Sequence, residues 1–425
     1  MSCKGMVLCL VAILCIPGRT RGQEYDFEIP EIEERNLEFS GNLDGKWGLL
    51  DPRKDSPFYP LQKLPATADN YLSQYRLDFY LNGEYRFEEL RVFVKSFSQY
   101  VRQEPVDPSL FELYGSLNLS PRLSMSLGKR RYNWGKGYAF NPVGYVNTQK
   151  DPENPDLSLA GLSALSLDFN KSLAGHNLQN FSLSGIVLIP EAEDDTRFAP
   201  ASQIGMALKL YLLVRDVDIE FMTLYRKGQA RRYGADFAAN LQTNLEVHGE
   251  LDYAVDEDTY RILDGDLVHR QRSGFSYLLG ARYLATTNTT LIAEFYHRSN
   301  GMNEGEFIDY VTYVQDGPTD HTAPDTETNQ MIVSDLFRSK NLMRDYAYAK
   351  LTHPEPFSLL YSSVSAFVIY NLRDESFVLS PQFAYKPFTN FEFLCWPSLL
   401  AGGTATGYGS RAFQRRLEFW MRFFF

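Results

Sequence analysis

The chain has 425 residues, a net charge of −11 and a pI near 5.2. This acidic balance argues against nucleic acid as a partner, because proteins that bind a phosphate backbone present a basic surface. The length fits two or three soluble domains or one large barrel. Aromatic residues make up 14% of the chain although the mean hydropathy is −0.31, and this mixture favours strands with one lipid-facing side and one wet side.

Residues 1–22 are typical of a secretory signal peptide. Lys4 precedes an apolar run over 6–16, Pro17 ends that run, and Gly22 is a small residue suited to a cleavage site. A membrane anchor is disfavoured, because the run is shorter than the roughly 20 apolar residues of a spanning helix. The sequence therefore predicts cleavage before residue 23 and export of the rest.

The cysteines add two constraints. A lipoprotein is the weaker interpretation of the leader, because Cys15 follows Leu14 where lipid attachment needs a small residue. Removal of 1–22 leaves Cys395 as the single cysteine, so we expect no disulfide, no cysteine pair for a metal and no covalently attached haem. We expect no metal site and no cofactor.

Residues 23–36 are acidic and lack sustained alternation, and we interpret them as a periplasmic tail. Residues 37–425 carry about 18 segments of alternating apolar and polar residues, each near the ~10 residues of a tilted barrel strand. We predict an all-β, antiparallel, up-and-down transmembrane barrel of about 18 strands, with 16 as the alternative count. The predicted strands are 37–49, 74–82, 88–98, 111–119, 122–130, 158–169, 179–189, 203–214, 217–225, 232–241, 244–254, 274–285, 289–297, 344–352, 358–370, 376–386, 390–396 and 413–425.

The connections test this interpretation independently. In an outer-membrane barrel whose first strand runs outward, every even-numbered connection is a short periplasmic turn and the odd-numbered ones are free to be long. Here the even ones, such as 120–121, 215–216 and 387–389, are brief and mostly contain turn residues, and 170–178 is the longest of them and fits least well. The longest connections, such as 131–157 and 298–343, are odd-numbered.

The last strand carries the clearest alternation. One face is entirely apolar and consists of Leu417, Phe419, Met421, Phe423 and Phe425; the other consists of Arg416, Glu418, Trp420, Arg422 and Phe424. An apolar strand with no tail after it is an aggregation hazard unless its edge is paired, as a closed barrel pairs it with the first strand. The alternative is the buried last strand of a soluble β-sandwich. The terminal aromatic pattern resembles the C-terminal signature of bacterial outer-membrane barrels.

The less apolar face of each strand gives the predicted lumen. Its basic members are Arg76, Arg91, Lys95, Arg122, Arg130, Arg416 and Arg422, and closure places them on neighbouring strands. Its acidic members are Asp218, Glu220, Glu246, Glu250 and Asp252, on the opposite wall. Opposed walls would set a transverse field across a wet lumen and select polar or charged solutes. The alternative is that these charges pair with one another and only stabilise or plug the wall.

The most distinctive motif is GKRRYNWGKGYAFNPVGY, residues 128–145. Its glycines Gly135 and Gly137 permit positive φ or close backbone approach. We predict a loop that folds into the pore as a constriction, and its alternative is an aromatic-anchored turn at the membrane rim. The spacing of a phosphate-binding loop is absent. The candidate constriction residues are Arg131, Trp134, Lys136 and Tyr138.

Two further features were weighed for chemistry. The acidic loop 298–343 lacks the residue order of an EF-hand, and we expect it to be solvated rather than to bind a divalent cation. His248 lies between Glu246 and Glu250 on its strand face, an arrangement able to orient an imidazole. No nucleophile motif such as GxSxG accompanies it, so a polar wall residue is the preferred interpretation.

The 128–145 motif, with the following KDPENPD at 150–156, resembles a stretch of poorly characterised porin-like outer-membrane barrels of proteobacteria. The resemblance implies a channel in the bacterial outer membrane through which small solutes diffuse. From the lumen charges we expect these solutes to be polar or charged, and the barrel to be in contact with outer-membrane lipid. A homo-oligomer and a periplasmic partner are both left open. Two alternatives stay open. One is a barrel that sheathes or exports with partner proteins, as in polysaccharide export or a porin–cytochrome conduit, and the other is an outer-membrane hydrolase using His248.

Overall fold

The computed structural model describes residues 36–59, 71–102, 105–155, 159–175, 177–190, 203–316 and 341–425, with isolated positions at 332–333, 336 and 339. The predicted signal peptide 1–22 and residues 23–35 of the predicted periplasmic tail lie outside the described residues. Those two predictions stay predictions.

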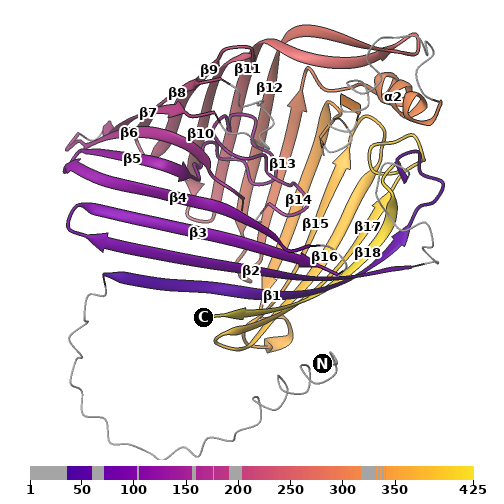
Figure 1. The fold of residues 1–425 in the computed structure, drawn as a ribbon, viewed down its shortest axis with the longest axis horizontal. Helices are drawn as coiled ribbons and strands as arrows, with labels where there is room; N and C mark the ends of the chain where they lie inside the picture. Colours follow the sequence, from indigo (N-terminus) through magenta and orange to yellow (C-terminus); the bar gives the residue numbers. More distant parts are fainter. Residues whose placement is uncertain are drawn as a thin grey trace, which may run out of the picture. The chain divides into compact units, whose positions relative to one another are not determined.

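Within the described residues, 18 antiparallel strands form one closed sheet (Figure 1). They are β1 (Leu37–Pro52), β2 (Leu72–Phe87), β3 (Leu90–Val101), β4 (Asp107–Ser120), β5 (Leu123–Arg130), β6 (Leu162–Ser172), β7 (Leu178–Leu188), β8 (Gly205–Val214), β9 (Val217–Arg226), β10 (Arg231–Gln242), β11 (Leu245–Leu263), β12 (Asp266–Leu284), β13 (Thr290–Arg298), β14 (Asp345–Pro354), β15 (Ser362–Asn371), β16 (Phe377–Phe388), β17 (Phe391–Ala401) and β18 (Phe413–Phe424). Each strand pairs with the next along the chain. The predicted strand number is confirmed.

The ring closes between the last strand and the first. β18 pairs with β1 over a register that runs from Asn42 opposite Phe424 to Pro52 opposite Phe413. The terminal Phe425 adds two backbone hydrogen bonds with Gly41, of 3.0 and 3.1 Å. Figure 1 shows the two ends of the sheet side by side. Closure leaves no unpaired edge, which is the condition for a sheet in lipid.

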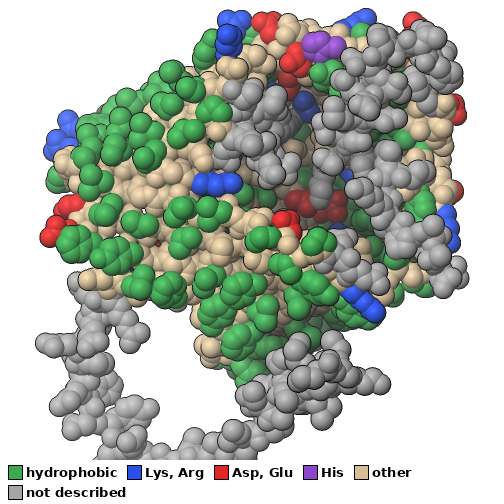
Figure 2. Space-filling model, viewed as in Figure 1, with side chains coloured by type: hydrophobic (Ala, Val, Ile, Leu, Met, Phe, Trp, Pro, Cys, Tyr) green, Lys and Arg blue, Asp and Glu red, His purple; other side chains and the backbone are tan. Residues whose placement is uncertain are grey.

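Alternating side chains separate the two faces of the wall. On β18, Phe419, Met421 and Phe423 are exposed on the outer face, whereas Trp420 on the inner face is buried. Figure 2 shows apolar side chains over the strand wall, with most charged side chains at its margins. An apolar outer band around a polar interior is the pattern of a transmembrane barrel. The soluble-sandwich alternative is wrong.

The connections alternate in length as predicted. The even-numbered connections are short, and several have only two residues, such as 121–122, 215–216 and 389–390. The longest of them, 355–361, contains the 3-10 helix η2 (Pro356–Ser358). The longest connections, 131–161 and 299–344, both lie at the other end of the barrel. That end is the outer one if the even turns face the periplasm.

The predicted strands 244–254 and 274–285 leave residues 255–273 as a long connecting loop, and this prediction is wrong. β11 and β12 instead continue as a hairpin that turns at Asp264 and Gly265, both with positive φ. Figure 1 shows this hairpin reaching beyond its neighbours toward the helix α2. The segment was mistaken for a loop because it carries charged residues on both faces, and both faces of a hairpin that leaves the membrane are free to be polar.

The acidic segment after β13 is also more ordered than predicted. It contains the helix α2 (Glu304–Asp316), which buries Phe307, Tyr310 and Tyr313 against the outer ends of the strands. Glu306 on α2 lies 3.3 Å from Arg261 of the hairpin. The described part is therefore a packed helix and not an irregular loop, while its acidic residues Glu304, Asp309 and Asp316 are exposed to solvent as expected. None of the described helices is both long enough and apolar enough to cross a bilayer.

Candidate functional site

The segment that follows β5 lies inside the barrel, against the wall formed by β9 to β14. Its main anchor is Glu250 on β11, which accepts backbone N–H bonds from Lys136 at 2.6 Å, Gly137 at 2.5 Å and Val143 at 3.2 Å. Glu250 is only 3% exposed. A buried carboxylate must replace the water it loses, and charge-assisted bonds from the backbone do this well.

A second carboxylate anchors the next residues of the segment. Glu294 on β13 accepts the backbone N–H of Ala139 at 2.9 Å and that of Tyr138. His248 on β11 lies 3.2 Å from the same carboxylate and 3.6 Å from Glu246. The imidazole that was weighed as an acid or base therefore sits beside an anchor of the loop and supports its position.

Side chains of the segment contact the same wall. The Lys136 ammonium lies 2.9 Å from Glu220 on β9, and Lys209 on β8 lies 3.2 Å from that carboxylate. The Tyr145 hydroxyl donates to Asp252 on β11 at 2.6 Å. The segment is thus bound to several strands through their carboxylates.

The two glycines of the motif explain how the backbone comes so close. A Cβ at Gly135, where φ is +90°, would lie 2.1 Å from Asn141 Oδ1 and 2.7 Å from Glu250 Oε1. At Gly137 it would lie 2.1 Å from the carbonyl oxygen of Phe140. Side chains at these positions would push the backbone off the carboxylate.

The remaining candidate constriction residues have structural contacts. The Arg131 N–H donates to Glu112 at 3.0 Å, and Trp134 is buried. Lys350 on β14 donates to the Tyr138 hydroxyl. These contacts place the motif inside the barrel and not at the membrane rim.

The five predicted acidic residues all lie on the inner faces of β9 and β11. Three of them, Glu220, Glu250 and Asp252, bind the loop as described. Asp218 accepts a hydrogen bond from the Tyr211 hydroxyl, and the Glu246 side chain is 35% exposed. Most of the acidic wall therefore faces the loop and not open solvent.

The loop also reaches the far wall. Glu153 lies 3.7 Å from Arg416 on β18, and the Lys150 ammonium donates to the carbonyl of Gly137 within the loop at 2.6 Å. Asn154 and Pro155 follow directly and line a cavity on that side. The loop also packs against the inner faces of β6 to β8. It consequently divides the lumen into a filled half, along β6 to β13, and an open half, along β1 to β3 and β14 to β18.

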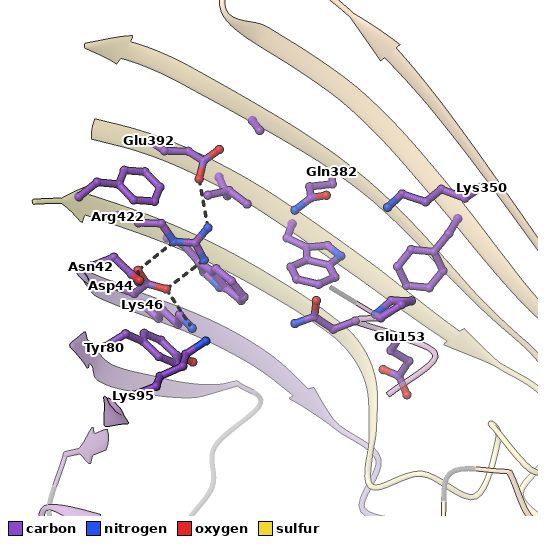
Figure 3. A pocket seen from close by; sticks show the side chains of 18 of the residues that line it. Asn42, Asp44, Lys46, Tyr80, Lys95, Glu153, Lys350, Gln382, Glu392 and Arg422 are labelled. Carbon is purple, nitrogen blue, oxygen red and sulfur yellow. Dashed lines mark hydrogen bonds and ion pairs between the residues drawn. The ribbon is translucent and has the colours of Figure 1, made fainter. Parts of the chain in front are cut away.

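The open half contains a cavity of about 400 Å³ (Figure 3). Arg422 on β18 binds Asp44 on β1 through two contacts of 2.9 and 3.0 Å and Glu392 on β17 at 3.2 Å. Figure 3 shows Lys350 across the cavity from this group. The four cations that line the cavity are Lys46, Lys95, Lys350 and Arg422, and the three carboxylates are Asp44, Glu153 and Glu392.

The cations of the open half are partly neutralised by carboxylates of their own wall. Lys46 lies 2.6 Å from Asp78 and 3.9 Å from the centre of the Trp420 ring. Arg76 lies 3.2 Å from Asp78. The predicted basic wall is therefore a mixed wall with a small excess of cations around the cavity.

The other predicted basic residues are spread along the barrel. Arg91 lies 2.7 Å from Glu84, at the end of the barrel that carries the short even-numbered connections. Arg130 lies 3.8 Å from Asp168. Arg122 is exposed at the β4–β5 turn. Of the predicted basic residues, only Lys95 and Arg422 line the cavity. Arg416 lies next to it, where it pairs with Glu153 of the loop.

Several residues at the site were missed by the sequence analysis. Glu294 and Lys350 lie on the inner faces of β13 and β14, so the same alternation would have found them. Glu153 lies in the KDPENPD stretch of the loop, and the spacing of residues there does not predict its ion pair with Arg416. Asp236 on β10 is different, because alternation does place it in the lumen. The residue is 2% exposed, and neither of its side-chain oxygens has a hydrogen-bond partner in the described structure.

No family model matches the sequence, and no curated protein matches it. Solved structures do share the fold. The chain is similar to OccK8 (OprE) of Pseudomonas aeruginosa, with 9% identity, 92% of this chain and 98% of that chain covered and a TM-score of 0.58. A BenF-like porin from Pseudomonas fluorescens Pf-5 has 9% identity, 92% and 98% coverage and a TM-score of 0.56. OccK2 (OpdF) of Pseudomonas aeruginosa, solved in complex with glucuronate, has 10% identity, 92% and 96% coverage and a TM-score of 0.55. The predicted porin-like fold of an outer-membrane barrel is confirmed.

Proposed function

We propose that the chain is a passive outer-membrane channel for small hydrophilic anions, with the pathway along the open half of the lumen and the loop that starts at residue 131 as its constriction. The observation that carries this proposal is the unequal use of charge in the two halves. The acidic side chains of the filled half bind loop donors, whereas the cavity of the open half has four cations against three carboxylates.

The field in the cavity follows from these contacts. Asp44 and Glu392 both bind Arg422, and Glu153 is paired with Arg416, which lies outside the cavity. Lys350 donates to the Tyr138 hydroxyl and lines the cavity together with Lys46 and Lys95. A low-dielectric wall strengthens a small excess of positive charge, and the excess favours anions.

The lining also has apolar faces. Trp396, Trp420, Tyr348 and Phe367 line the cavity beside the cations. Aromatic faces next to ammonium and guanidinium groups suit a solute that combines a ring with a carboxylate. OccK2, which shares this fold, was solved with glucuronate. We therefore include small ring-bearing carboxylates, such as sugar acids, in the proposal.

The sheath or exporter, the hydrolase, the homo-oligomer and the periplasmic partner remain predictions. His248 has a role in this proposal without catalysis, because it supports the Glu294 anchor.

The deciding experiment is single-channel recording of the refolded chain in a planar bilayer, with reversal potentials under a salt gradient. We expect steady conductance with anion preference, and Lys350→Gln to lower that preference. The control is Lys227→Gln, an exposed lysine in the β9–β10 turn, which should leave it unchanged. A folded barrel that never conducts, or one that prefers cations, would overturn the proposal.

A further inference from the structure

The outer face of the barrel carries an apolar groove that the channel proposal does not use. It spans β16, β17, β18 and β1 and has a volume of about 490 Å³. Its walls and floor are formed by Leu49, Leu379, Pro381, Pro397, Leu399 and Leu417. Leu379 and Leu399 are exposed on the outer surface, so the groove opens toward lipid.

Two prolines create the depression. β16 and β17 pair Leu379 with Leu399 and Phe383 with Cys395, and the same register places Pro381 opposite Pro397 between them. Neither proline has an N–H, so no ladder hydrogen bond forms between them, and the compact rings leave a gap in the apolar surface. Proline is usually confined to the edges of sheets, and a closed barrel has none. Two prolines paired on interior strands depart from this preference, and such departures from local sequence rules often mark a functional surface.

The outer end of the groove carries a cation. The Arg415 side chain is 67% exposed, and its nearest carboxylate, Asp51, lies 4.0 Å away. Asp51 accepts a shorter bond of 2.9 Å from Gln414. Tyr71, which is exposed, lines the groove at the same end. An apolar trough that ends in an exposed guanidinium and a tyrosine has the layout of a lipid site at the membrane interface.

We propose that this groove binds lipid A of the outer leaflet, with an acyl chain along Pro381 and Pro397 and a phosphate at Arg415. Arg415 lies at the end of β18 that joins the β17–β18 connection, and this odd-numbered connection belongs to the outer side. A guanidinium binds a phosphate through two parallel N–H bonds, which its weak contact with Asp51 leaves open. The inference rests on the proposed outer-membrane location and not on channel activity.

The test uses the refolded full chain in detergent micelles with added diphosphoryl lipid A, and bound lipid is counted by native mass spectrometry. We expect one lipid A per chain, and about tenfold weaker binding in Arg415→Gln, because a charge-assisted bidentate contact is lost. The double variant Pro381→Leu, Pro397→Leu should also bind less, because the added side chains fill the trough. The shift of the folded band on unheated gels confirms that each variant has folded.

The matched control is Arg231→Gln. Arg231 is an arginine at the outer end of β10, half exposed and 3.3 Å from Asp256, but it lies away from the groove. It should bind lipid A as the unchanged chain does. Equal binding by all variants would refute the site, and equal binding of phosphatidylglycerol would replace lipid A by any anionic phospholipid. Arg415-dependent dimers in the absence of lipid would assign the groove to a second copy. A chain that binds lipid A but does not conduct would refute only the channel.

Discussion

The two halves of the lumen use the same kinds of side chain in different ways. In the filled half, Glu250 and Glu294 accept backbone N–H bonds from the loop. In the open half, Asp44 and Glu392 bind the side chain of Arg422 from their own wall. A carboxylate in the first half holds a segment in place, whereas a carboxylate in the second sets the local field.

If the chain is the proposed channel, this contrast explains why the charge of the wall alone would not give selectivity. The filled half is rich in carboxylates, yet loop donors bind most of them, and an ion passing through would meet the loop instead. The open half has a nearly balanced wall whose small excess of cations faces the cavity. What matters is the charge left uncompensated where the solute passes.

The largest effect is expected from Glu250→Ala. Three backbone donors lose their acceptor, and bonds to a charged group contribute about 1.5–3 kcal/mol each. We expect the loop to leave the wall, with conductance raised severalfold and cleavage by added protease within 131–155. The control Glu246→Ala removes a carboxylate of the same strand that contacts only His248 among the groups described above. Unchanged conductance and protease resistance in Glu250→Ala would remove the distinction between the two halves.

A smaller effect of the same kind is expected from Gly137→Ala. The new Cβ would lie 2.1 Å from the Phe140 carbonyl oxygen and 2.9 Å from a methyl group of Leu278. The backbone must shift, which lengthens its bonds to Glu250 without removing the acceptor. Current recordings should show a noisier, moderately larger conductance. The control is Gly228→Ala, where nothing lies within 4 Å of the new Cβ, although its positive φ adds local strain. A noise level equal to that of this control would contradict the argument.

Glu392→Gln addresses the open half. It removes one of the three cavity carboxylates and leaves Arg422 bound to Asp44. We expect anion preference to rise about twofold with little change in conductance, because the field changes and the loop does not move. Reversal potentials under a salt gradient measure this change. Glu294→Gln is the matched substitution in the filled half and should alter conductance more than preference. The opposite pattern in the two variants would reverse the roles given to the two halves.

The smallest effect is expected from Asp236→Asn. Asp236 is buried without a hydrogen-bond partner and lies opposite Glu220 and Glu250 in the register of β9, β10 and β11. Lys136 and Lys209 are the nearby cations, and both bind Glu220. Asn is neutral, and its amide N–H can donate to the neighbouring carboxylates, so the substitution should raise the free energy of unfolding by about 1–3 kcal/mol. Denaturant unfolding of the barrel in lipid measures it. The control is Asp218→Asn, which weakens the acceptor of the Tyr211 hydroxyl and should lower the free energy of unfolding. A loss of stability in both variants would show that favourable interactions offset the burial of Asp236.

The sequence by itself determined the barrel. Period-two alternation decided which face of each strand meets lipid, the connection lengths decided which ends are turns, and the apolar terminal strand required closure with the first. These properties depend on residues near one another in sequence. The prediction failed over 255–273 and over α2, outside the membrane, where no lipid imposes an apolar face and the pattern loses its meaning.

Only the tertiary structure decided what the charges do. Glu250 and Lys136 lie 114 positions apart, and Glu153 and Arg416 lie farther apart still. Alternation placed Glu250 and Arg422 in the lumen but gave them no partners. A lumen carboxylate binds the loop, sets the electrostatic potential of the cavity or destabilises the fold, depending on which donors folding brings to it. This is because the energy of a charge depends on its neighbours and on its exposure to solvent. The spacing of residues along a strand specifies neither the neighbours nor the exposure.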